Sequence, residues 1–469
     1  MLKQHDVLRV FRSIVYNVLF LSYIVSLAIP VTGMKHFLSI VSILALLLSL
    51  IGIGLFYQAV VGLALAGSFA MLWIYDLYSW EILYHFASLT NIIVLIAYAS
   101  LFSIPVHLGM YPRKLYLHFK SRVASFKSLY ATFSVTTYLL CSVMGTPGIP
   151  TVRSSLYLFL RKLPEHFRKE FQSITYVRAF ILVIFWTPVA AANTVALAQT
   201  GANAMIVLPI VFVLSIVYLF IDIQTADWRL RKKLGPDAQG LDSFRARDES
   251  RASGKTKKSL IIFLLILCVF IGAVFLFSHF SGYSILDSVI FMILPFSFLW
   301  ALALRRGKRY MQTLSRRFAQ DVPKLSPQIA LFISFGFMIN VISMSGLSEG
   351  INALVDYLQA WIGPFVLLVI SIIVVALTWL GILPQLVVVF VTQTLDLRAL
   401  GLNPEWFVIA IVGAALSGSS WSPFAVNSNI VAVTIDEKPI NVVRRNIIFS
   451  INLLVITSLL AIILQVLYP

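Results

Sequence analysis

Long apolar segments alternate with short polar links along the whole chain. Runs of about 20 apolar residues can cross a bilayer as helices. The first such helices are predicted at about 13–30, 37–55, 57–76 and 86–106. Further ones are predicted at about 173–199, 203–223, 259–278, 284–304, 327–346, 406–433 and 446–466. The pattern therefore predicts an all-α polytopic membrane protein with about eleven transmembrane helices.

Two more apolar stretches are interrupted and predict a different element. The stretch 128–160 lies between two basic blocks, is too short for two full spans, and is broken by Gly-Thr-Pro-Gly-Ile-Pro. The stretch 362–396 is broken by Gly-Ile-Leu-Pro and has acidic flanks. Glycine and proline favour a turn, and irregular backbone at membrane depth is tolerated where protein or water covers it. Each stretch therefore predicts a re-entrant hairpin, and the two hairpins enter from opposite faces.

Composition and charge restrict the class of protein further. The 469 residues are 59% hydrophobic and only 12% charged, which excludes a soluble enzyme, a nucleic-acid binder and a disulfide scaffold. The net charge of +17 comes from blocks of Lys and Arg between apolar segments, as in cytoplasmic loops. We therefore expect a multi-pass protein of the inner or plasma membrane with a cytoplasmic N-terminus and no nucleic-acid partner.

One motif occurs twice and divides the chain into similar halves. Trp186-Thr187-Pro188 is matched 235 positions later by Trp421-Ser422-Pro423, and amide residues follow each copy. Each copy also follows its Gly/Pro turn at a similar distance, 38 residues in one half and 39 in the other. A proline inside a span interrupts the helix. Two hairpins and two broken helices of opposite orientation predict inverted-topology repeats, which many secondary transporters use to build a midplane site.

The repeat gives the expected domain organisation. The predicted parts are scaffold helices at 1–85, repeat 1 at 86–223, a cytoplasmic loop at 224–258, linking helices at 259–325 and repeat 2 at 326–469. Repeat 1 contains the hairpin 128–160 and the broken helix 173–199. Repeat 2 contains the hairpin 362–396 and the broken helix 406–433.

This order of hairpin, broken helix and span resembles the ion transporter superfamily, which includes divalent-anion/sodium symporters, citrate transporters and arsenite permeases. The resemblance covers about residues 86–223 and 326–469. It implies eleven spans, scaffold and transport domains, a homodimer and an elevator-like motion. The hairpin tips of that family often carry Ser-Asn-Thr, whereas the tips here read Gly-Thr-Pro-Gly and Trp-Leu-Gly-Ile-Leu-Pro.

The candidate site residues lie at the two tips and in the two broken helices. They are Thr146, Gly148, Arg153, Thr187, Asn193, Thr194, Gly381, Ser419, Ser422, Asn427 and Asn429. Ser, Thr and Asn can instead join packed helices, and Arg153 can instead extend its charge to the membrane surface. Arg178 is expected to snorkel in that way, and Asp222 to cap a helix end.

These residues predict a secondary transporter of a small, anionic solute, coupled to Na⁺ or H⁺ and without a cofactor or metal. Membrane lipids and a second copy of the chain are the other expected partners. Two alternatives are an integral-membrane enzyme, for which the sequence offers no convergent His/Asp/Glu set, and a scaffold whose loop at 224–258 docks a partner. We therefore expect that the chain is not an enzyme.

Overall fold

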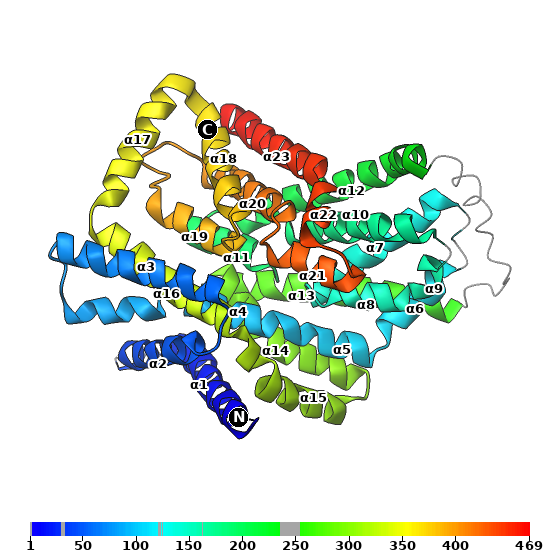
Figure 1. The fold of residues 1–469 in the computed structure, drawn as a ribbon, viewed down its shortest axis with the longest axis horizontal. Coiled ribbons are helices and arrows are strands. Elements are labelled where there is room, and N and C mark those ends of the chain that lie inside the picture. The colour runs from blue at the N-terminus through cyan, green and yellow to red at the C-terminus, as the bar shows by residue number, and fades with distance from the viewer. Residues whose placement is uncertain (1, 30–32, 121–122, 124, 162, 235–253) are drawn as a thin grey trace.

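The computed structural model describes residues 2–29, 33–120, 123, 125–161, 163–234 and 254–469, and all regular structure within these ranges is helical (Figure 1). Nine helical segments of the described chain are long and apolar enough to cross a bilayer. They are Asp6–Ala28, Leu55–Ile74, Trp80–Leu108, Ala204–Ala226, Lys258–Ser281, Ile285–Ala303, Val322–Met344, Leu347–Trp379 and Ile447–Leu467. By length and composition, the chain is a multi-pass helical membrane protein.

The N-terminal helices lie where the apolar pattern predicts them. They are α1 (Leu2–Ala28), α2 (Met34–Leu50) and α3 (Leu55–Ile74). The fourth predicted span is composite and consists of η1 (Trp80–Ala87), α4 (Thr90–Ala99), η2 (Ser100–Phe102) and α5 (Ser103–Leu108). The 3-10 turn η2 carries the chain from α4 into α5 without a loop.

The predicted repeat 1 contains a helical hairpin and then an interrupted helix. After α6 (Tyr111–Lys120), the hairpin consists of α7 (Phe126–Met144), α8 (Gly148–Ser155) and α9 (Tyr157–Leu160). The interrupted helix consists of α10 (Glu165–Ile184) and α11 (Ala191–Thr200), and α12 (Ala204–Leu234) follows. Both interruptions fall at the predicted Gly/Pro and Trp-Thr-Pro positions. A Cβ added at Gly148 would lie 2.6 Å from Sγ of Cys141, so a larger residue would force the two arms of the hairpin apart.

The segment between the repeats differs from the predicted loop. Helix α12 continues to Leu234 and α13 (Gly254–Ser281) begins at Gly254, so both ends of the expected polar loop are helical. Residues 235–253 of that loop lie outside the described residues. Next come α14 (Ile285–Ala303), α15 (Gly307–Gln320), η4 (Val322–Leu325) and α16 (Ser326–Met344). Helix α15 occupies one of the blocks of Lys and Arg that the charge pattern predicts as loops.

The predicted repeat 2 has the same order of elements. Its helices are α17 (Leu347–Ile362), η5 (Gly363–Phe365), α18 (Val366–Trp379), α19 (Pro384–Thr394), α20 (Pro404–Ser420), α21 (Val426–Ile435), α22 (Pro439–Arg444) and α23 (Ile447–Leu467). The first arm of the hairpin, α18, packs against α20. Gly418 makes this close approach possible because it has no side chain. A Cβ added there would lie 2.0 Å from Oγ1 of Thr378 and 2.7 Å from the carbonyl oxygen of Val375.

The two repeats meet through corresponding elements. Helix α11 of repeat 1 packs against α19 of repeat 2, and α21 of repeat 2 packs against α8 of repeat 1. In Figure 1, α11 and α19 lie left of the centre, and α8 and α21 lie right of it. Each pair joins the second hairpin arm of one repeat to the helix that follows the break of the other. The tips and the breaks therefore gather in the middle of the molecule.

Candidate functional site

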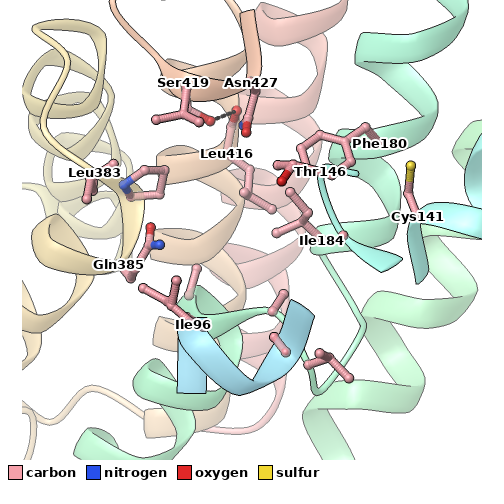
Figure 2. A pocket seen from close by; sticks show the side chains of 18 of the residues that line it. Ile96, Cys141, Thr146, Phe180, Ile184, Leu383, Gln385, Leu416, Ser419 and Asn427 are labelled. Carbon is pink, nitrogen blue, oxygen red and sulfur yellow. Dashed lines mark hydrogen bonds between the residues drawn. The ribbon is translucent and has the colours of Figure 1, made fainter. Parts of the chain in front are cut away.

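A cavity of about 260 Å³ lies where the two hairpin tips meet the two interrupted helices (Figure 2). Its walls come from the ends of α7 and α10, the segments 145–147 and 189–192, the tip at 381–385, and residues of α20 and α21. Ile96, Ala99 and Ser100 close one side together with Gln328 of α16. Segments more than 200 residues apart in the sequence thus line one cavity.

Five of the eleven predicted site residues line this cavity. They are Thr146, Thr187, Gly381, Ser419 and Asn427. The other six, which do not line it, are Gly148, Arg153, Asn193, Thr194, Ser422 and Asn429. Most of these six hold the cavity wall together through hydrogen bonds to backbone carbonyls.

The hydroxyl of the Trp-[Thr/Ser]-Pro motif has the same role in both repeats. Thr187 donates to the carbonyl of Ser142 at 3.3 Å, near the end of α7. Ser422 donates to the carbonyl of Trp379 at 2.7 Å, at the end of α18. In each repeat, the hydroxyl joins the interrupted helix to the first arm of its own hairpin. It also satisfies a carbonyl at the helix end, which water cannot reach inside a bilayer.

The tryptophans of the motif also pack alike. The ring of Trp186 lies 6.2 Å from that of Tyr138 on α7, and the ring of Trp421 lies 6.2 Å from that of Trp379 on α18. Both partners are aromatic residues on the first hairpin arm. The sequence repeat is therefore also a repeat of contacts.

The amides after each break donate to backbone carbonyls at the break. Proline at position 188 has no N–H to donate to the carbonyl of Ile184, four residues earlier. Asn193 donates to that carbonyl through Nδ2 at 2.7 Å and is almost completely buried. In the second repeat, Nδ2 of Asn429 donates to the carbonyls of Pro423 and Ala425. These amides are bound to the protein's own backbone.

Two other predicted residues have local contacts. Thr194 donates to the carbonyls of Ala190 and Ala191 in the first turn of α11. Arg153 on α8 is half-buried and makes no hydrogen bond or ion pair within the described ranges. Neither residue contributes to the cavity wall, and Arg153 therefore supplies no charge to it.

Four helices begin at the cavity wall, and none has a side-chain cap. Helix α8 begins after Pro147, α11 after Ala190, α19 after Leu383 and α21 after Ala425, and all four N-cap residues line the cavity. Helices usually begin at Ser, Thr, Asp or Asn, whose side chains accept hydrogen bonds from the first-turn N–H groups. Proline, alanine and leucine offer no such acceptor. The positive ends of four helices are therefore left without an acceptor from their own caps.

Four polar side chains on the wall make no hydrogen bond within the described structure: Thr146, Gln328, Gln385 and Asn427. The buried Oε1 of Gln328 has no partner. Figure 2 shows Thr146 and Gln385 on opposite sides of the space, with Asn427 above. No Asp, Glu, Lys, Arg or His lines the cavity in the part of the chain that the structure describes. Its polarity thus comes from amides, hydroxyls and helix ends.

Sequence reasoning missed Gln328 and Gln385. Gln385 directly follows Pro384 at the predicted tip, so its position was a usable signal. Gln328 lies on α16, outside both the hairpins and the interrupted helices, and only the fold brings it to the cavity.

Away from the cavity, the structure corrects the expectation for two charged residues. Arg178 does not extend to the membrane surface, because it is 5% exposed and donates to Asp222 at 2.7 Å and to Asn446 at 3.2 Å. Asp222 does not cap a helix end, because it also accepts from Arg229 and from the hydroxyl of Tyr130. This buried cluster joins α7, α10, α12 and the start of α23. No local pattern predicts this pairing, because the two partners lie 44 residues apart.

Comparisons with known proteins identify no family for this chain. The chain matches no protein-family model, and no curated protein is significantly similar to it in sequence. The fold itself defines the class, which is an all-α, multi-pass membrane protein. Within the described ranges, no group of three His, Cys, Asp or Glu side chains is arranged to hold a metal ion.

Proposed function

We propose that the chain is a secondary active transporter of a small, anionic solute that binds in the central cavity. The observation that carries the proposal is the convergence of four helix N-termini without side-chain caps, two from each repeat, on one cavity. In the proposed arrangement, eleven spans surround two re-entrant hairpins that enter from opposite faces. This is the architecture that the resemblance to the ion transporter superfamily implies.

The preference for an anion follows from an imbalance between helix ends. Helix N-termini carry a partial positive charge and C-termini a partial negative one. Carbonyls at the breaks already accept hydrogen bonds from Thr187, Asn193 and Ser422, whereas the N-termini have no caps. The first-turn N–H groups of α11 and α21 make no hydrogen bond in the described structure. In α8, by contrast, Gly148 and Ile149 donate to the carbonyls of Gly145 and Thr146, so α11 and α21 supply the free positive ends. Anions bind readily at such ends, and transporters use broken helices in this way.

The free side chains on the wall would complete the recognition of the solute. The carboxamides of Gln328, Gln385 and Asn427 and the hydroxyl of Thr146 can each donate a hydrogen bond to an oxyanion. A cavity of about 260 Å³ is smaller than the roughly 300–1,000 Å³ typical of drug-sized pockets, which favours a small solute. The driving ion in this proposal is Na⁺ or H⁺.

The test uses full-length protein in proteoliposomes adsorbed on a solid-supported membrane. Transport currents are recorded on jumps of acetate, succinate, sulfate and inorganic phosphate, each in Na⁺ and in K⁺ buffer and with and without a pH gradient. We expect a protein-dependent current with at least one anion, and the buffer pair identifies the driving ion. Asn427→Ala and Gln328→Ala should reduce that current at least tenfold.

The matched control is Asn340→Ala on α16. Its amide donates to Gly336 within the same helix and does not line the cavity, so the current should stay near the wild-type value. Folding of each variant is verified by its melting temperature in detergent. The proposal is contradicted if none of the four anions gives a current, or if the two cavity variants carry as much current as the control.

A further inference from the structure

Helix α15 places an uncompensated cationic face at one side of the membrane. It connects the end of one predicted span, α14, to η4 and the start of another, α16, so it lies at a membrane face rather than across the bilayer. Its sequence, GKRYMQTLSRRFAQ, contains four Lys or Arg residues and no acid. Amphipathic helices rich in Lys and Arg typically lie in the interface plane of a membrane.

The inner face of α15 is fixed to the bundle by buried contacts. The hydroxyl of Tyr310 bonds to that of Ser297 on α14 at 2.6 Å, and Leu314, one turn later, is also buried. Arg317 donates to the carbonyl of Ser100 at 2.7 Å. One of the four cations is therefore committed to the protein, and the orientation of the helix is set.

The outer face of α15 borders a groove of about 790 Å³. The groove is lined by Leu108, Arg309, Met311, Gln312, Thr313, Ser315 and Arg316. Arg309 and Arg316 are seven residues apart, which places them on the same side of the helix about 10 Å apart along its axis. Both are exposed, and neither makes an ion pair or a side-chain hydrogen bond within the described ranges. Leu108 and Met311 add apolar surface between and beside the two charges.

A second basic groove lies near the other end of α15, and its cations already have partners in the protein. It is lined in part by Arg9, Arg12 and Lys324. Arg9 pairs with Asp6, Lys324 pairs with Asp321, and Arg12 donates to carbonyls at the end of α2. The cations of that groove are therefore already occupied by the protein.

We infer that the groove with Arg309 and Arg316 binds the head group of an anionic phospholipid from the adjoining leaflet. Two free guanidinium groups complement a phosphate, which Arg can bind in a bidentate manner. The apolar side chains provide a surface for the glycerol and the first part of an acyl chain. A lipid is the occupant because α15 lies where the leaflet ends, and basic clusters on amphipathic helices attract anionic lipids. This inference does not depend on the proposed transport function.

The experiment titrates detergent-solubilised full chain with phosphatidylglycerol or with zwitterionic phosphatidylcholine and follows the melting temperature. Phosphatidylglycerol should raise the melting temperature further, and the difference should shrink with added salt because the charges are exposed. The double variant Arg309→Gln/Arg316→Gln should bind phosphatidylglycerol roughly thirtyfold more weakly, since each near-surface cation contributes about fivefold. The matched control Lys308→Gln removes an exposed cation of the same helix that does not line the groove, and should bind like the wild type.

Native mass spectrometry provides a second measurement that does not require unfolding. The wild type should retain at least one phosphatidylglycerol more than the double variant when both are prepared in the same lipid mixture. If the double variant does not fold, the single variants are compared in the same way, and each should lose part of the retained lipid. Equal stabilisation by the two lipids, or equal lipid binding by the wild type and the double variant, would overturn the inference.

Discussion

In the interrupted helix of repeat 1, one side-chain hydrogen bond replaces a missing helical hydrogen bond. Proline at position 188 leaves the carbonyl of Ile184 without its helical donor, and Asn193 replaces that donor at 2.7 Å. Beyond the end of α10 at Ile184, one helical hydrogen bond persists, from the N–H of Thr187 to the carbonyl of Val183. An N–H at position 188 would therefore be well placed to reach Ile184. Pro188→Ala should make the amide of Asn193 redundant.

The magnitude follows from the environment of this bond. Side-chain hydrogen bonds inside membrane proteins contribute about 0.6 kcal/mol on average and up to about 1.7 kcal/mol. Leaving a buried carbonyl unpartnered costs about 1–3 kcal/mol. We expect Asn193→Ala to lower the free energy of unfolding by about 1–2 kcal/mol, consistent with both ranges. When Pro188→Ala is also present, the same substitution should cost less than about 0.5 kcal/mol.

The assay is a double-mutant cycle in mixed micelles, with SDS as denaturant and tryptophan fluorescence as the signal. Asn340→Ala is the control, because its amide bonds to Gly336 inside an unbroken helix and its other side-chain contact, with His85, lies away from the break. The control should cost the same in both backgrounds. The reasoning is refuted if Asn193→Ala costs the same with and without Pro188→Ala, since the coupling energy would then be zero.

Two further predictions concern packing and charge. Gly418→Ala should destabilise the protein by about 1–3 kcal/mol or more, because the added methyl has no space between α18 and α20. The control Gly67→Ala on α3 should not destabilise it, because the added methyl meets no atom within 4 Å. Both variants are measured by the same SDS titration. Asp222→Leu should cost about 3–5 kcal/mol, because it leaves the buried guanidinium of Arg178 without an acid. Arg178→Met should cost less, because Arg229 still pairs with Asp222 at 2.7 Å. The double substitution should cost less than the sum of the two single ones, and a strictly additive result would show that the two side chains do not stabilise each other.

The positions of the interruptions could be predicted from the sequence because their causes are local. Proline removes a donor and glycine permits a turn wherever they occur, so the breaks near Pro188, Gly381 and Pro423 follow from single residues. The pairing of the two motifs also came from the sequence alone. The sequence predicts the residues around each break as site residues, and the geometry sorts them into cavity-lining and wall-supporting groups.

That sorting depends on tertiary contacts that no local pattern contains. Asn193 and Asn427 occupy similar positions in the two motifs, yet one is bound to a carbonyl and the other lines the cavity. Gln328 reaches the cavity only because α16 packs beside α19 and α4. The pairing of Arg178 with Asp222 needed the packing of α10 on α12.

Helix α15 shows a different kind of error. Its basic composition indicated a polar loop, although Tyr310, Leu314 and Arg317 recur at helical spacing. In this segment the composition favours a loop, whereas the periodicity favours a helix. The buried contacts of these three side chains show that periodicity was the better guide.

The hydroxyl bonds of Thr187 and Ser422 have a mechanical consequence. Each ties a hairpin to the interrupted helix of its own half, and the contacts of α11 with α19 and of α8 with α21 cross between the halves. These hydrogen bonds and helix contacts thus join the elements into a single block that forms most of the cavity wall. The rest of the wall, with Ile96 and Gln328, belongs to α4 and α16. The cavity therefore lies at the boundary between this block and α4 and α16.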